Sequence, residues 1–232
     1  WDEIYDTRET ARTREWHLSY AGEVRQLLRP YLEQASSVTG KPAVDVGAGG
    51  SSIALSIRED FAFDRVVLID ASETIVAECS ARYAGAEGVE VLVGDARSLP
   101  FADGSAALVV DKGTLDALHS GADQSAMMSE CARIVADGGV IVTISFSAVA
   151  RLRFLAAAAA AHGLEEHVHV VGAGDPKDGH ACVFVALLAR KLEPTYAPSE
   201  LTRRVLDRAE RHGTLYDEDD PQELTLFDED DL

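Results

Sequence analysis

The sequence predicts a doubly wound α/β fold, and three features of the 232-residue chain point to it. Short, β-branched, nearly continuous apolar runs recur along it, as in strands that are buried on both faces of a parallel sheet. Segments with helical spacing separate these runs. After Gly163 two strand-like runs follow each other with no room for a helix between them. We therefore expect a mostly parallel, seven-stranded sheet that ends in an antiparallel hairpin.

The predicted elements alternate through the first five strands. The strand runs are Ala43–Gly47, Arg65–Asp70, Val89–Val93, Ala107–Asp111 and Val140–Phe146. The helix-like segments are Ser51–Glu59, Glu73–Tyr83, Gln124–Val135 and Ala148–His162. The closing runs are His167–Val171 and Ala181–Leu188, and the turn-rich Gly172–Gly179 joins them as a hairpin. A dinucleotide-dependent dehydrogenase would be expected to add a sixth parallel strand instead, so the hairpin disfavours that class.

The chain divides into three expected regions. Residues 1–40 have helical spacing and carry aromatic residues such as Trp16 and Tyr20. Residues 41–192 form the α/β domain, and residues 193–232 form a C-terminal helix and an acidic tail. No internal repeat is visible.

The amino-acid composition limits the classes of partner that the chain can bind. The formal net charge of −19 argues against a nucleic-acid partner, because phosphate binding needs clustered Lys and Arg. Nine acids and no base lie between Asp217 and Asp231, so about half of the charge belongs to the tail. No apolar run approaches the ~20 residues that span a bilayer. The three cysteines are Cys79, Cys131 and Cys182, whose wide spacing predicts reduced core thiols in an intracellular protein.

The loop after the first strand reads Gly47-Ala48-Gly49-Gly50-Ser51. Glycines there let the backbone turn tightly and approach a ligand at a helix N-terminus. The third glycine of the dinucleotide fingerprint is absent, with Ser52 in its place. A tight turn without a ligand is the alternative.

Acids follow the next two strands. Asp70, with Ala71 after it, stands where a carboxylate can accept hydrogen bonds from both ribose hydroxyls of an adenosine. Asp95 stands where an acid receives the adenine amino group, and the backbone N–H of Ala96 meets the ring. The alternatives are an exposed strand-end acid at Asp70 and a turn cap at Asp95. Three such sites at one edge of the sheet favour an adenosyl ligand, and NAD explains only the first two.

The segment from Asp111 to Leu118 reads DKGTLDAL. It resembles the DKGTLDA signature of the methyltransferase-like 13 group, which modifies elongation factor 1-alpha, and of the related citrate synthase lysine methyltransferase. The resemblance covers most of residues 1–190, including Gly47–Ser51, Phe101–Ser105 and Ser129–Ile134. It implies a class I methyltransferase, for which a closing antiparallel strand is a hallmark, with S-adenosylmethionine as cofactor and a protein amine as acceptor. The family usually has Cys and then Asn or Thr where this chain has Ala48 and Gly50.

Asp111 and Trp16 are assigned roles in the predicted site. Asp111, at the end of the fourth strand beside Lys112, is the candidate catalytic residue, because a carboxylate near the donor methyl can orient an incoming ammonium. It could instead pair with Lys112 or cap the next helix. The resemblance implies that residues 1–40 form a helical lid over the cofactor that includes Trp16, with Arg12 or Arg14 near the methionine carboxylate. A buried anchor is the alternative for Trp16.

The leading functional hypothesis is a protein lysine or N-terminal amine methyltransferase, with elongation factor 1-alpha or citrate synthase as partners by resemblance. The alternatives are a small-molecule methyltransferase and a non-catalytic adenosyl-binding module whose acidic tail docks a basic partner. No histidine has metal-ligand spacing with cysteines or acids, so we expect no metal. The sequence is compatible with a dimer, and with the cytoplasm or the mitochondrion.

Overall fold

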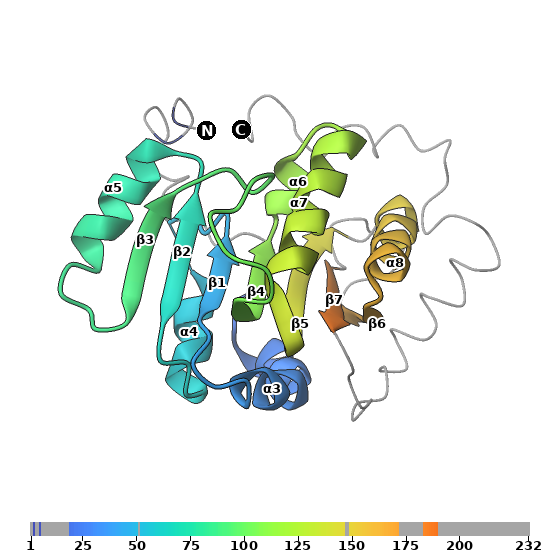
Figure 1. Cartoon of the computed structure of the whole chain (residues 1–232), viewed down its shortest axis with the longest axis horizontal. Coiled ribbons are helices and arrows are strands. Elements are labelled where there is room, and N and C mark those ends of the chain that lie inside the picture. Colours follow the sequence, from blue (N-terminus) through green and yellow to red (C-terminus); the bar gives the residue numbers. More distant parts are fainter. Residues whose placement is uncertain are drawn as a thin grey trace.

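The computed structural model describes residues 2, 5, 19–50, 52–146, 149–171 and 183–189. Its centre is a twisted sheet with strand order β3-β2-β1-β4-β5-β7-β6 (Figure 1). The strands are β1 (Ala43–Val46), β2 (Val66–Asp70), β3 (Val89–Val93), β4 (Ala106–Lys112), β5 (Val135–Phe146), β6 (Glu165–Val171) and β7 (Val183–Ala189). The first five pair in parallel, which confirms the predicted doubly wound α/β class. Strand β7 pairs antiparallel with both β5 and β6.

The strand order reverses between β1 and β4. Strands β2 and β3 extend the sheet to one side of β1, whereas β4 and β5 extend it to the other. Because all five run in the same direction, the loops that follow them meet at one edge, and the reversal leaves a crevice there. The loops that the sequence singled out are those that follow β1 to β4.

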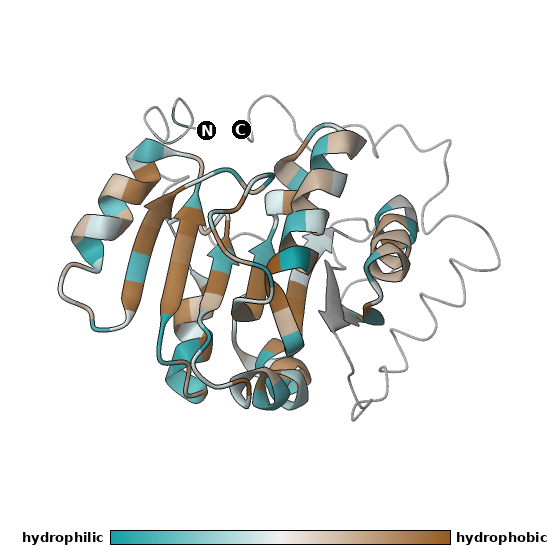
Figure 2. Ribbon diagram, in the orientation of Figure 1, coloured by the Kyte–Doolittle hydropathy of each residue, from teal (hydrophilic) through white to brown (hydrophobic). Residues whose placement is uncertain are grey.

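Helices cover both faces of the sheet. They are α3 (Gly22–Ser36), α4 (Ile53–Asp60), α5 (Glu73–Arg82), α6 (Thr114–Ala117), α7 (Gly121–Ile134) and α8 (Val149–His162). One core joins α3 and α4 to alternate residues of the strands, such as Leu68 and Val110. The other joins α7 and α8 to the intervening residues, such as Val67 and Val109. Figure 2 shows the hydrophobic residues along the central strands and many hydrophilic ones on the helices.

Serine caps fix where three helices begin. Ser52, Ser72 and Ser120 precede α4, α5 and α7, and each side chain accepts a hydrogen bond from the backbone N–H three residues later. Such a cap satisfies one of the N–H groups that a helix leaves free at its start, which is worth ~1 kcal/mol. Helices α4 and α5 thus begin directly after the loops that follow β1 and β2.

The structure differs from the prediction around β4 and β5. The short helix α6 was not expected, and β5 starts at Val135, which the helical pattern had assigned to the preceding helix. The chain passes from α7 into β5 without a loop, because Val135 already has extended dihedral angles. The hairpin turn at 172–179 and the acidic tail lie outside the described residues. In the described part of the chain, no helix is both long and apolar enough to cross a membrane.

Candidate active site

The loop after β1 is held against the end of β2. The backbone N–H groups of Gly47 and Ala48 both donate to the carbonyl oxygen of Ile69, at 2.8 and 3.1 Å. Gly47 and Gly49 have φ angles of 68° and 55°, in the left-handed region that favours glycine. The loop therefore turns back on itself at the carboxyl edge and leads into α4.

The loop also contacts the segment that follows β4. The Thr114 hydroxyl, at the start of α6, donates to the Val46 carbonyl oxygen at 2.9 Å. A Cβ atom on Gly47 would lie only 2.0 Å from Thr114 Oγ1. This contact explains two sequence features together, the first glycine of the loop and the threonine of the DKGTLDA segment. It joins the β1 and β4 loops across the reversal of the sheet.

Asp70 faces the same loop from the end of β2. Its Oδ2 accepts from the Gly49 N–H at 2.9 Å, and its Oδ1 accepts from the Ser72 N–H at 2.9 Å. Burial raises the pKa of this carboxyl group above its ordinary value, and the backbone N–H donors oppose that rise. Each carboxylate oxygen has two lone pairs. The Ala71 N–H is a third backbone donor to this carboxylate, and three donors among the described residues leave part of its acceptor capacity for a ribose.

A small hollow adjoins this carboxylate, and its lining includes Ala48, Gly49, Asp70, Ile75 and Val91. It has no room for even a water molecule, so it does not by itself enclose a nucleoside. The residues around it fit a nucleoside, because they offer apolar walls, a glycine loop and one acidic group.

Before residue 19 the structure describes two residues, and both lie beside α5. Asp2 accepts hydrogen bonds from the Ser72 hydroxyl and the Thr74 N–H. Tyr5 is buried against Ile75 and Cys79, and burial chiefly raises the pKa of its hydroxyl. Asp2 and Tyr5 thus lie at the edge of the sheet where Asp70 ends β2. Trp16, the residue that we expected over the cofactor, lies outside the described residues, as do Arg12 and Arg14.

Asp95 follows β3, where the sequence predicted it, but its carboxylate is already engaged. Arg97 donates to Asp95 Oδ1 from Nε at 2.9 Å and to Oδ2 from Nη2 at 2.7 Å. The bond from Arg97 lowers the pKa of Asp95 below its ordinary value, against a smaller opposing effect of burial. Ala71 is exposed and Ala96 is half-buried. Ala71 follows β2 and Ala96 follows β3, as expected.

Asp111 lies in the interior, where none of its surface reaches solvent. Its Oδ1 accepts from the N–H groups of Thr114 and Leu115, at 2.9 and 3.1 Å, so it caps α6. Burial, followed by the nearby charge of Asp116, raises its pKa to about 8. The group therefore holds its proton at neutral pH. This placement matches the helix-capping alternative rather than a carboxylate exposed to an incoming ammonium.

Lys112 is half-buried beside the loop after β1. Its charge is one of the influences on Asp45, whose pKa is raised to about 6, chiefly by burial. Asp45 accepts from the Ser52 hydroxyl at 2.7 Å and from the Ala54 N–H at 3.3 Å. The acid before the glycine loop thus holds the start of α4 in place.

Sequence reasoning missed a second polar cluster, at the ends of β4 and β5. Asp116 Oδ1 accepts from the Ser145 hydroxyl at 2.6 Å and from Arg151 Nη2 at 3.1 Å. The side chains of the Asp116–Arg151 ion pair are 10% and 13% exposed. Asp116 belongs to the DKGTLDA segment, but its partners lie 29 and 35 residues away and no sequence pattern connects them. No group of His, Cys, Asp or Glu side chains among the described residues is arranged to hold a metal ion.

Comparisons with known proteins agree with this geometry. Residues 44–143 match the family model of a methyltransferase domain. The mitochondrial citrate synthase-lysine N-methyltransferase of Pongo abelii is 29% identical over 164 residues, which cover 62% of this chain and 68% of that protein. EEF1A lysine methyltransferase 4 of Mus musculus is 28% identical over 159 residues, which cover 62% of this chain and only 59% of that protein.

The fold is shared with solved structures. The N-methyltransferase NodS of Bradyrhizobium japonicum, crystallised with S-adenosyl-L-homocysteine, superposes with a TM-score of 0.57 at 14% identity. The superposition covers 82% of this chain and all of that one. The family match covers residues 44–143, which is fewer than half of the 232 residues, and the likeness to NodS shows the fold alone. The matched domain and the relatives support S-adenosylmethionine as the methyl donor.

Proposed function

We propose that this chain transfers the methyl group of S-adenosylmethionine to an amine on another protein, a lysine side chain. The observation that carries the proposal is the segment Asp111–Ala117. It resembles the signature of protein lysine methyltransferases, and Thr114 packs it directly onto the glycine loop. The acceptor side of the site is therefore next to the donor side. The relatives named as lysine methyltransferases of citrate synthase and of EEF1A support the same acceptor class.

We propose donor-binding roles for the loops that follow β1, β2 and β3. The backbone from Gly47 to Gly49 lies along the methionine and ribose portions, and Asp70, followed by Ala71, accepts from the two ribose hydroxyls. The loop of Asp95 and Ala96 receives the adenine. We assign Trp16 to the cover over the donor and Lys112 to the wall beside it.

The donor supplies an electrophilic methyl group on a sulfonium. The acceptor amine must first lose its proton, so that its lone pair can form the new C–N bond as the C–S bond breaks. Asp111 cannot contact that amine, because it has no exposed surface. We propose instead that it acts as a positioning residue, because its cap on α6 keeps Thr114 against the glycine loop. Since Asp111 holds its proton at neutral pH, it places no negative charge below the acceptor that would oppose deprotonation.

The acceptor side suits a protruding side chain. Between β4 and β5 the chain forms only α6 and α7, so this connection holds no large insertion that could cover an acceptor. A small-molecule enzyme would be expected to enclose its acceptor. We retain the three proposed regions, residues 1–40, 41–192 and 193–232. The intracellular compartment and a dimeric state stay predictions.

The test is methyl transfer to proteins. The chain is incubated with S-adenosylmethionine that carries a labelled methyl group and with a cell lysate, and labelled bands are digested to find the modified residue. We expect one or a few bands that carry methyl-lysine. Purified citrate synthase and elongation factor 1-alpha are tested separately. Labelling of small molecules alone would overturn the protein acceptor, and donor binding without any transfer would show a binding module.

A further inference from the structure

The guanidinium of Arg97 donates to both carboxylate oxygens of Asp95, so this carboxylate is not free to rotate. Besides the two bonds given above, Arg97 Nε lies 3.1 Å from Asp95 Oδ2, and the backbone N–H of Arg97 donates to Oδ1 at 2.8 Å. A guanidinium and a carboxylate that meet side by side share one plane and fix each other's orientation. Arg97 thus determines the direction in which the carboxylate faces.

Arg97 is itself anchored to another element. Its Nη1 donates to Asp123 Oδ1 at 2.7 Å, in the first turn of α7. Asp123 in turn accepts from the Ser120 hydroxyl at 2.7 Å, and Ser120 caps the same helix. Figure 1 shows the long connection from β3 to β4 running along the edge of the sheet toward α6 and α7. Arg97 ties the loop that carries Asp95 to the start of α7.

This arrangement limits what Asp95 can still accept. Oδ1 receives two donors, Arg97 Nε and the Arg97 backbone N–H, which use both of its lone pairs. Oδ2 receives Nη2 and a longer share of the same Nε–H. Three N–H groups thus meet four lone pairs, and among the described residues one lone pair, on Oδ2, stays open. The residue therefore presents a single hydrogen-bond acceptor in a fixed direction and no donor.

We propose that Arg97 is a positioning residue that makes the donor site selective for a purine with an amino group at position 6. The inference rests on the proposed function, in which Asp95 faces the adenine. An exocyclic amino group donates a hydrogen bond to the one open acceptor of Asp95. A 6-oxo purine presents an oxygen there, and two acceptors would face each other without a proton between them. Without Arg97 the carboxylate would rotate, and binding would have to order it.

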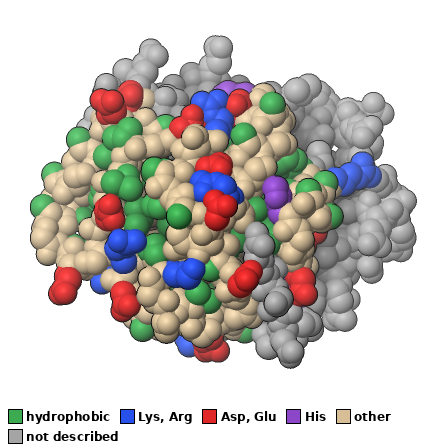
Figure 3. All heavy atoms as spheres, viewed as in Figure 1, with side chains coloured by type: hydrophobic (Ala, Val, Ile, Leu, Met, Phe, Trp, Pro, Cys, Tyr) green, Lys and Arg blue, Asp and Glu red, His purple; other side chains and the backbone are tan. Residues whose placement is uncertain are grey.

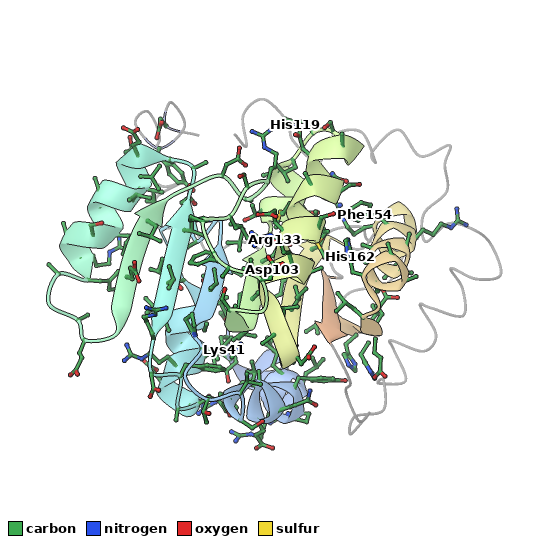
Figure 4. All side chains as sticks on the ribbon, viewed as in Figure 1. Lys41, Asp103, His119, Arg133, Phe154 and His162 are labelled. Carbon is green, nitrogen blue, oxygen red and sulfur yellow. The ribbon has the colours of Figure 1, made fainter. Side chains whose placement is uncertain are left out.

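A neighbouring arginine provides a matched control. Arg133 also bridges two acids, Glu130 and Asp103, and also holds the β3–β4 connection by donating to the Leu99 and Phe101 carbonyl oxygens. Figure 4 labels Arg133 and Asp103 close together in front of the sheet, and Figure 3 shows Lys or Arg side chains flanked by acids in that area. Arg133 has no bond to Asp95 among the described residues. Its loss therefore loosens the same connection and leaves the hydrogen bonds between Arg97 and Asp95 intact.

The experiment measures product binding rather than turnover. Dissociation constants of S-adenosylhomocysteine and S-inosylhomocysteine are determined by calorimetry for the wild type and for Arg97→Met, Arg133→Met and Asp95→Asn. We expect the wild type to prefer the adenosyl ligand. Arg97→Met should weaken that ligand roughly three- to tenfold, with little effect on the inosyl ligand, since one side chain must then be ordered on binding. Arg133→Met should leave the ratio of the two constants unchanged.

The outcomes separate this inference from the proposed function. If the wild type and Arg97→Met show the same ratio while both melt cooperatively, Arg97 does not set the selectivity. If Asp95→Asn also leaves the ratio unchanged while the adenosyl ligand binds tightly, the adenine lies elsewhere and only this inference fails. If the wild type binds neither ligand, the proposed function fails with it. The positioning role is supported if the preference for the adenosyl over the inosyl ligand becomes smaller in Arg97→Met and Asp95→Asn but not in Arg133→Met.

Discussion

At the scale of single residues, burial decides what a carboxyl group can do in this site. Asp70, at the sheet edge, keeps part of its acceptor capacity, whereas Asp111, two strands later, has no exposed surface. Both end a strand, and the sequence gives them similar surroundings. They differ in the structure because Asp111 is enclosed beside α6, whose first two N–H groups donate to it. Asp70 is therefore the acid with capacity left for a ligand, and Asp111 is the acid that maintains the local fold.

Replacing Asp70 tests its proposed ribose contacts. Asp70→Ala should weaken S-adenosylhomocysteine at least about tenfold, because hydrogen bonds to a charged group are worth roughly 1.5 to 3 kcal/mol each. Calorimetry measures the dissociation constant. Asp64→Ala removes an equal charge at an exposed position near the other end of β2 and should leave binding unchanged. An unaltered constant in Asp70→Ala would show that this residue is not the ribose acid.

The raised pKa of Asp111 makes a prediction about stability and pH. The folded protein keeps this proton up to pH of about 8, whereas the unfolded chain releases it near pH 4, so the contribution of Asp111 to stability falls as the pH rises between these values. Asp111→Asn has no such proton. The free energy of unfolding of Asp111→Asn relative to wild type should therefore increase by ~2–4 kcal/mol between pH 5.5 and 8.5.

Urea denaturation at the two pH values measures that change. Asp45 and Glu166 also have raised pKa values, but they are present in both proteins and cancel in the difference. Asp60→Asn serves as the control, because the hydrogen bond from Arg25 lowers the pKa of Asp60 below its ordinary value, and it should show a difference that is independent of pH in this range. A constant difference for Asp111→Asn would mean that its carboxyl group is ionised in the folded protein at neutral pH.

At the scale of elements, the short helix α6 joins the two halves of the site. Its N-cap is Gly113 with φ of 83°, its first N–H groups bond to Asp111, and Thr114 contacts the glycine loop. Four residues cannot form a stable helix on their own. These contacts with neighbouring strands therefore hold α6 in place.

Gly47→Ala should break this junction. A left-handed residue other than glycine costs about 1–2 kcal/mol, and displacing Thr114 adds roughly 1–3 kcal/mol. Gly163→Ala is the matched control, because Gly163 has nearly the same φ, 64°, and no other atom lies within 4 Å of a Cβ there. Urea unfolding should show a larger loss for Gly47→Ala, together with weaker donor binding. Equal losses in the two variants would show that Thr114 yields without strain.

The sequence predicts the main elements well, because their signals are local. The buried strand runs β1 to β4 and the helices α4 and α5 are each found within one or two residues of their predicted limits. Features that depend on long-range contacts were not predictable. Helix α6 has no periodic pattern, and the Arg97–Asp123 and Arg151–Asp116 pairs join residues 26 and 35 positions apart. Local patterns locate the acids at the strand ends but not the arginines that restrain them.

At the scale of the whole molecule, the net charge of −19 attracts a basic protein over long range. Nine of the acids lie between Asp217 and Asp231. Such attraction reaches ~30 Å at 10 mM salt but only ~8 Å at physiological ionic strength. Charge in the tail would therefore affect the encounter with the acceptor at low salt and leave the donor site unaffected.

The last prediction concerns this tail. Truncation after Tyr216 should raise the Michaelis constant for a basic protein acceptor several-fold at ~10 mM salt, and much less at ~150 mM, because the removed acids attract the acceptor only where screening is weak. The dissociation constant of S-adenosylhomocysteine should stay the same. A second variant keeps the length of the tail but replaces its nine acids with Asn and Gln, so that charge is separated from chain length. If the neutral tail behaves like the intact one at low salt, charge plays no part in recruiting the acceptor, whereas a Michaelis constant as high as that of the truncated protein assigns the effect to the carboxylates.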